Sequence, residues 1–148
     1  MTQLNLIELL EGALSTPPNK ERVELFLAAL EGGEYTQCSG TQRAPNLFNP
    51  QQPWRYCALG VATKVALDNG LLEGMGEVSE YALTLYDSGV LEPLVADWYG
   101  FNSLDPILAK DEDGNWDSVS SFNDDGKDFR WIAQAGRARW LKDQGSDG

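Results

Sequence analysis

The residues with the greatest chemical potential in this chain are its two cysteines, because a thiolate can act as a nucleophile or as a metal ligand. Cys57 falls near the start of a predicted helix, where the helix dipole can lower the pKa of a thiol. Catalysis by such a thiol also needs a base, and the chain of 148 residues holds no histidine. Cys–His and Ser–His–Asp catalysis in their usual forms are therefore excluded. We expect Cys57 to be a buried structural residue rather than a nucleophile.

Metal binding is also disfavoured by the residue types present. Without histidine, and with only two cysteines, the chain lacks the ligands of the usual zinc sites. The segment from Asp111 to Asp117 places Asp or Asn at alternate positions, as a calcium loop does. An EF-hand loop needs glycine at its sixth position and glutamate at its twelfth, where this chain has Trp116 and Phe122. The pattern therefore predicts an acidic turn without calcium, and no metal or other cofactor is expected.

Several polar residues lie in or beside a long irregular loop that is predicted over residues 34–53. A structureless loop of this length is often functional. Gln37, Cys57 and Asn123 could converge where this loop meets the N-termini of two helices. Such a cluster can bind an anion or a small polar ligand, or it can be the network that pins the loop to the core, which we favour. The candidate ligand-binding residues are Tyr35, Gln37, Arg55, Cys57, Asn123 and Asp124.

The acidic residues are concentrated in the middle of the chain. Residues 71–125 hold thirteen acidic residues and one basic residue, Lys110, so this segment carries a net charge of −12, equal to that of the whole chain. The segment is either an interaction surface for a basic partner or a set of acidic loops that keep the protein soluble, and we favour solubility. The candidate partner-binding residues are Asp111, Glu112, Asp113 and Asp117. Direct binding of nucleic acid is disfavoured, because it needs a basic face.

The composition predicts one globular domain over residues 1–148. Hydrophobic residues make up 42% of the chain and include five Trp, five Tyr and five Phe, which is enough apolar material to form one core. No apolar stretch is long enough to cross a membrane, and the N-terminus lacks the basic start of a secretory signal. The two cysteines are too few for a disulfide scaffold. We therefore expect a cytoplasmic location, with Cys38 and Cys57 as free thiols.

Hydrophobic spacing and turn residues predict an α+β fold that is predominantly helical, with a small antiparallel β-hairpin. The residues that flank the acidic turn, 106–109 and 116–119, are expected to form the hairpin. Asp125 is expected to cap the last helix, and one short strand is possible at 35–37. The segment 78–86 is ambiguous between strand and helix, and residues 144–148 are expected to form a frayed tail. The expected helices are 4–14, a second that starts after residue 16 or residue 19 and ends before Gly32, then 54–67, 88–98 and 127–142.

Three short motifs recur in the same order in other proteins. They are Gly-x-Tyr-x-Gln at residues 33–37, Cys-x-Leu-Gly at 57–60 and Asn-Asp-x-Gly-x-x-Phe-x-x-Ile-Ala at 123–133. Over about residues 25–135 the chain resembles a diffuse group of uncharacterised proteins that are encoded mostly by tailed bacteriophages. The resemblance implies a viral origin and a shared fold, and it implies no particular activity.

Three hypotheses about function follow from these observations. The first is a non-enzymatic phage accessory protein that binds and inhibits a host protein, such as a defence or replication factor, in the cytoplasm of the host cell. The alternative is a protein that sequesters a small molecule or a nucleotide-like signal at the cluster around Gln37, Cys57 and Asn123. A carboxylate- or thiolate-based enzyme ranks last, because the usual catalytic groups are missing. No contact with a membrane or directly with nucleic acid is expected.

Overall fold

The structure is a computed structural model that describes residues 18–47, 50–73 and 79–141. Its elements confirm the predicted fold class, α+β with helices dominant and a small antiparallel hairpin. The helix predicted over 4–14 and the tail over 144–148 lie outside the described residues. Within the described ranges, no helix combines the length and the apolar character that a transmembrane span requires. The helices are α2 (Lys20–Glu31), α3 (Ala58–Asp68), α4 (Ser79–Thr84), α5 (Pro93–Tyr99), α6 (Val119–Asp124) and α7 (Phe129–Gly136), and α7 continues into a π-helical turn, η1 (Arg137–Leu141).

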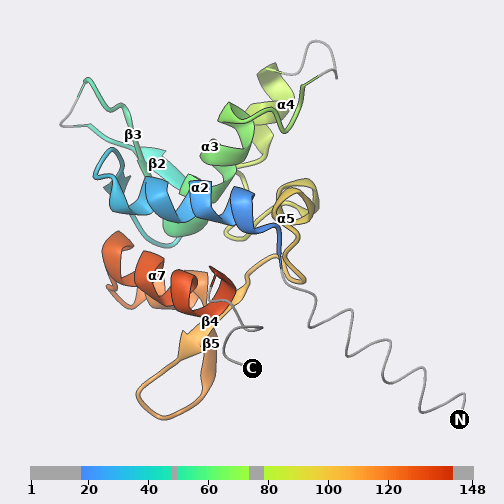
Figure 1. The fold of residues 1–148 in the computed structure, drawn as a ribbon. Helices are drawn as coiled ribbons and strands as arrows, with labels where there is room; N and C mark the ends of the chain where they lie inside the picture. Colours follow the sequence, from blue (N-terminus) through green and yellow to red (C-terminus); the bar gives the residue numbers. More distant parts are fainter. Residues whose placement is uncertain (1–17, 48–49, 74–78, 142–148) are drawn as a thin grey trace, which may run out of the picture.

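Helix α2 lies at the centre of the helical layer, between α3 and α7 (Figure 1). It begins where the side chain of Asn19 accepts a hydrogen bond from the backbone N–H of Arg22, which is the second of the two caps that the sequence allowed. Its buried stripe is the predicted one, made of Val23, Phe26, Leu27 and Leu30. Burial of each such side chain contributes roughly 1.5–3 kcal/mol, which is why this helix fixes the positions of its two neighbours.

The segment before α3 forms a strand, where the sequence analysis predicted the start of a helix at Trp54. Strand β3 (Trp54–Tyr56) is the centre of a three-stranded sheet, parallel to β1 (Thr36–Gln37) and antiparallel to β2 (Arg43–Pro45). The predicted loop over 34–53 therefore contributes two short strands, one of which is the strand expected near 35–37. Strands of two or three residues are too short for a period to appear in the sequence, and the pairing of β3 on both edges decides its conformation.

The C-terminal half contains the predicted hairpin, formed by β4 (Ile107–Lys110) and β5 (Trp116–Ser118). The second strand ends one residue earlier than predicted, because the side chain of Ser118 caps α6 by accepting from the N–H of Ser121. The cap of α7 is Asp128 and not Asp125, since Asp128 Oδ1 accepts from Trp131 N at 2.8 Å. The hairpin extends from the helical body on the side away from α3 and α4 (Figure 1).

The remaining differences concern the segment between α3 and the hairpin. The ambiguous segment 78–86 contains a short helix, α4, and the helix expected over 88–98 is confined to α5. Proline has no N–H to donate and favours the first position of a helix, so α5 begins at Pro93. Residues 88–92 form neither helix nor strand, and they are held by contacts from elsewhere in the chain.

Those contacts come from Gln42, a polar side chain with 0% of its surface exposed. Its Nε2 lies within hydrogen-bond distance of the carbonyl oxygens of Leu85 (3.1 Å), Ser88 (3.0 Å) and Val90 (2.6 Å). Its Oε1 accepts from the Thr63 hydroxyl of α3 at 2.6 Å. One side chain from the 34–53 segment therefore joins α3 to the stretch between α4 and α5.

The backbone of Gln42 also contacts α3, at Gly60. The carbonyl oxygen of Gln42 accepts a hydrogen bond from Cys57 N at 3.0 Å. A Cβ added at Gly60 would lie 1.9 Å from that oxygen, well inside van der Waals contact. Glycine at position 60 is therefore required by close approach of another backbone, a condition that no local pattern in the sequence indicates.

We predict that Gly60→Ala destabilises the fold by about 3 kcal/mol, because the added methyl group must displace a backbone that is hydrogen-bonded. Gly89→Ala is the matched control, since Gly89 has ordinary backbone angles and open space around it, and it should change stability by no more than about 0.5 kcal/mol. Denaturant unfolding of both variants measures the difference. A Gly60→Ala protein as stable as its control would contradict the close approach of Gln42.

Candidate functional site

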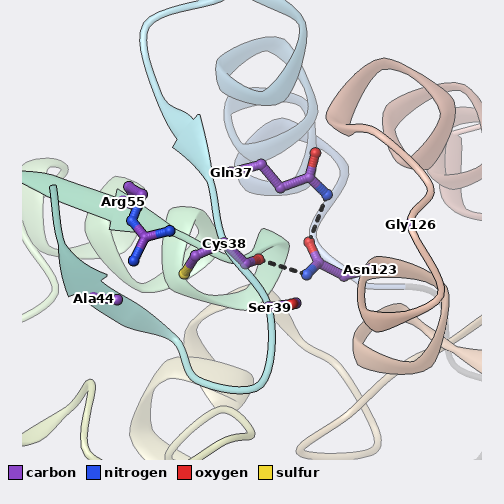
Figure 2. A pocket seen from close by; sticks show the side chains of 7 residues that line it. All are labelled: Gln37, Cys38, Ser39, Ala44, Arg55, Asn123 and Gly126. Carbon is purple, nitrogen blue, oxygen red and sulfur yellow. Dashed lines mark hydrogen bonds between the residues drawn. The ribbon is translucent and has the colours of Figure 1, made fainter. Parts of the chain in front are cut away.

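The structure brings two of the predicted polar residues, Gln37 and Asn123, into direct contact (Figure 2). Gln37 Nε2 donates to Asn123 Oδ1 at 2.9 Å and to the carbonyl oxygen of Lys127 at 2.7 Å. Gln37 belongs to β1, whereas Asn123 lies in α6, 86 residues later. The contact therefore joins the start of the 34–53 segment to the C-terminal helices.

Asn123 is buried, with 2% of its surface exposed, and its amide group takes part in three hydrogen bonds. Besides Gln37, its Oδ1 accepts from Ala58 N at 3.0 Å, and its Nδ2 donates to the carbonyl oxygen of Cys38 at 2.8 Å. This single side chain thus binds β1, the residue that follows it and the first residue of α3. These hydrogen bonds support the structural interpretation of the polar cluster, in which the amides pin the long segment to the core.

The N-terminus of α3 is closed by protein groups. The N–H of Cys57 donates to Gln42, the N–H of Ala58 donates to Asn123, and the N–H of Gly60 donates to the sulfur of Cys57 at 3.4 Å. A helix N-terminus binds an anion through its free N–H groups, and these three are occupied. The anion site that the sequence analysis considered at this helix end is therefore not available there.

Cys57 is the N-cap of α3 and a buried thiol. Burial raises the pKa of Cys57 to about 11, although the N–H groups of Gly60 and Leu59, which point at the sulfur, act in the opposite direction. The helix end on which the sequence analysis based a lowered pKa is thus outweighed by loss of solvent. Burial also raises the pKa of Cys38, and both cysteines are free thiols. Neither is a thiolate near neutral pH.

The other predicted ligand-binding residues occupy different environments. Asp124 is exposed, and its Oδ1 accepts from the backbone N–H of Gly40 at 2.9 Å, which fixes the turn after β1. Tyr35 packs edge-on against Tyr56, and burial raises the pKa of its hydroxyl. Arg55, on the central strand β3, donates from Nε to the carbonyl oxygen of Pro45 at 3.1 Å. Of these three residues, Arg55 lines the pocket that contains Gln37 and Asn123.

That cavity is a surface pocket of about 430 Å³ between the sheet and α6 (Figure 2). Three predicted residues line it, together with four that the sequence analysis did not single out for a site. Of those four, Cys38 and Ser39 directly follow the motif residue Gln37, so their position beside it was the available signal. The lining residues are Gln37, Cys38, Ser39, Ala44, Arg55, Asn123 and Gly126.

The four acidic residues predicted to bind a partner divide into two pairs. Asp111 Oδ1 accepts from the N–H groups of Asp113 and Asn115, each at 2.9 Å, and so shapes the hairpin turn. The carboxylate of Asp117 accepts from Ser118 N and from the hydroxyl of Ser121. Glu112 and Asp113 are exposed at the turn. Nowhere in the described ranges do three or more Asp, Glu or Cys side chains group as metal ligands would.

The most exposed large aromatic residue of the described chain, Trp116, lies on the same hairpin. It is 56% exposed, and its ring is flanked by Lys110 Nζ at 5.4 Å and by the guanidinium carbon of Arg139 at 4.7 Å. Ile107, on the facing strand, is also exposed. The sequence analysis treated Trp116 only as a strand residue, because alternation places it on a face without showing what covers that face.

Comparison of the chain with protein-family models, with curated proteins and with solved structures finds no significant match. The resemblance to phage proteins therefore rests on short sequence segments alone, the three motifs and residues 95–101. The function of the pocket and of the hairpin can therefore be inferred only from their geometry.

We predict that Asn123→Ala destabilises the protein by about 3 kcal/mol, because it leaves a buried N–H, a buried carbonyl and the Gln37 amide without their partner. Gln134→Ala, at an exposed position of α7, is the control and should lie within about 0.5 kcal/mol of the native protein. Thermal or denaturant unfolding measures both. A loss below about 1 kcal/mol for Asn123→Ala would remove the structural interpretation of the network.

We predict that Cys57 contributes an alkaline decrease in stability. The unfolded thiol loses its proton near the ordinary pKa of 9.0, whereas the folded one does so at about 11. The stability that comes from burying the neutral thiol is therefore fully present below pH 9 and is lost as the pH rises through 11, by roughly 3 kcal/mol. Cys57→Ser keeps a capping oxygen and has no thiol to titrate. The free energy of unfolding of the native protein should therefore fall relative to that of Cys57→Ser as the pH rises from 9 to 11.

The tyrosines with raised pKa values titrate equally in the native protein and in Cys57→Ser, so the comparison cancels them. Cys57→Ala is a second reference, which also loses the cap and should be less stable by about 1 kcal/mol at neutral pH. Parallel pH profiles for the native protein and both variants would show that the thiol does not titrate as stated.

Proposed function

We propose that this chain is a non-enzymatic binding protein of a tailed bacteriophage that attaches to a host protein and inhibits it. The observation that carries the proposal is the β4–β5 hairpin, which presents an exposed Trp116 next to an acidic turn. The phage origin rests on the three motifs at residues 33–37, 57–60 and 123–133. The absence of histidine and the raised pKa of both thiols support a binding role over a catalytic one.

The hairpin has the features of a protein-binding surface. Tryptophan is among the residues that contribute most to binding energy at interfaces. Lys110 and Arg139 already contact the ring of Trp116, and these contacts reduce the rotational freedom that is lost when a partner covers it. The hairpin extends from the body, so a partner can reach the turn and the ring together (Figure 1).

The partner is expected to be basic at the point of contact. Glu112 and Asp113 are exposed at the turn, whereas Asp111 and Asp117 hold the hairpin and α6 in shape. The proposed contact therefore contains Glu112, Asp113 and Trp116, a smaller set than the four acidic residues of the sequence analysis. Complementary charge mainly speeds association and makes it sensitive to salt.

We predict that Trp116→Ala weakens binding of the partner by tenfold or more, as expected for a central interface tryptophan. The pair Glu112→Lys and Asp113→Lys should slow association and flatten its dependence on salt. The chain is immobilised to capture the partner from a bacterial lysate, and association and dissociation rates are then measured over a salt series.

Helix α4, at the opposite end of the molecule, supplies the matched controls (Figure 1). Leu83→Ala removes an equally exposed apolar residue, 55% exposed, and Glu80→Lys reverses an exposed acidic residue. Both control proteins should retain the partner with native rates. A captured partner that binds all five proteins alike would contradict the hairpin surface.

A further inference from the structure

Arg55 is an arginine without a carboxylate partner at the edge of a polar pocket. Its Nε is used by the carbonyl oxygen of Pro45, which leaves the other donors of the guanidinium group unassigned. The ion pairs of the described residues join Lys64 to Asp68 and Arg137 to two glutamates, and Arg55 is in neither group. Arg22, Arg43, Arg130 and Arg139 are likewise outside these ion pairs, and Arg55 differs from them in lining this pocket.

The pocket beside Arg55 contains hydrogen-bonding groups and no acidic side chain. Its polar lining side chains other than Arg55 are Gln37, Cys38, Ser39 and Asn123. The guanidinium group of Arg55 and the thiol of Cys38 lie on the same side of the 38–42 turn (Figure 2). The volume of about 430 Å³ falls within the range of small-molecule pockets, roughly 300–1,000 Å³.

Arg55 is the one charged side chain among the residues that line this pocket. Of the two charged groups that act on the Cys38 thiol, Arg55 has the larger effect on its pKa and Asp124 the smaller. Asp124 is outside the pocket lining, and one of its oxygens already accepts from Gly40 N. With Nε in use, the edge formed by the two terminal nitrogens of Arg55 remains, and a guanidinium edge binds an oxyanion with two parallel hydrogen bonds.

We propose that this pocket binds a small oxyanion, the phosphate or carboxylate group of a polar metabolite, with Arg55 as its principal ligand and Ser39 as a second donor. No aromatic side chain lines the pocket, so it offers no surface on which a nucleobase stacks. The ligand is therefore a compact anion rather than the nucleotide-like signal that the sequence analysis considered. This site is separate from the hairpin, and the inference does not rest on the proposed function.

The structure also supplies a way to block the site without removing Arg55. Ala44 lines the pocket and is the cross-strand partner of Arg55 in the antiparallel pair of β2 and β3. Cross-strand partners have neighbouring side chains, so Ala44→Glu places a carboxylate beside the guanidinium group. This variant should occupy Arg55 internally and exclude an external anion, while an opposite-charge pair preserves the sheet.

The test is a titration of the full chain in which the NMR chemical shifts of the backbone amides are monitored. The probes are inorganic phosphate, glycerol phosphate and succinate, each added at constant ionic strength set with sodium chloride. We expect saturable shifts for the amides of Ser39, Gly40 and Gly126, with a Kd on the order of 1 mM, typical of one charged contact. Preference for glycerol phosphate over succinate assigns a phosphate ligand, and the reverse preference assigns a carboxylate.

Two variants and one control decide the outcome. Arg55→Gln and Ala44→Glu should each weaken binding of the preferred probe by about tenfold or more. Arg139→Gln is the control, because it removes an arginine of η1 that contacts Trp116 and does not line the pocket, and it should bind the probe as the native chain does. If Arg55→Gln does not fold, Ala44→Glu and Arg55→Lys replace it. Arg55→Lys keeps the positive charge and loses the paired N–H donors of the guanidinium group, so it should also bind the probe more weakly than the native chain does. Absence of saturable shifts up to about 20 mM of every probe, far above that Kd, overturns the proposal. Equal binding by the native chain and all variants would also overturn the proposal, because it would show an adventitious ion only.

Discussion

The fold depends on a buried amide, the side chain of Gln42, which joins three parts of the chain. It has no exposed surface, and it meets three carbonyl groups between α4 and α5 as well as the hydroxyl of Thr63. Those carbonyls belong to a segment without regular structure, so they have no other partners within a helix or sheet. A buried carbonyl without a donor costs roughly 1–3 kcal/mol, and Gln42 removes that cost at several positions at once. The irregular middle of the chain can be buried because this amide is present.

Asn123 is a second buried amide that satisfies backbone groups, at the first residue of α3. Its amide satisfies the backbone of Cys38 and Ala58 and the side chain of Gln37. The two amides hold the segment from β1 to β2 between them, and that segment forms the floor of the Arg55 pocket. The hydrogen bonds of Asn123 to Gln37 and Cys38 therefore tie part of the pocket lining to α6.

The parts of the fold that are visible in the sequence are those governed by local rules. Asn19 and the stripe from Val23 to Leu30 define α2, and the acidic turn between two apolar segments defines the hairpin. Strand β3 was mistaken for the start of a helix, because Trp54–Tyr56 is too short to show a period and is set by pairing with β1 and β2. The shift of the α7 cap from Asp125 to Asp128 is a choice between two suitable residues that only the preceding helix decides.

In the candidate sites too, the features set by local sequence were predicted and those set by distant segments were not. The convergence of Gln37 and Asn123 was anticipated from their motifs, and the structure places them 2.9 Å apart. The burial of Gln42 and the exposure of Trp116 were not anticipated, because a side chain's environment depends on segments far away in the sequence. Likewise, nothing local to Gly60 shows that a backbone from residue 42 crosses the helix there.

The closed N-terminus of α3 has a consequence for how the molecule opens. The first N–H groups of a helix usually exchange with solvent quickly, because they lack partners within the helix. Here the amides of Cys57, Ala58 and Gly60 are held by Gln42, Asn123 and the Cys57 sulfur. The hydrogen of Cys57 can exchange only when Gln42 moves away, and that of Ala58 only when Asn123 of α6 does. The start of α3 therefore opens only with segments far away in the sequence, and its first amides should exchange more slowly than the first amides of a helix normally do.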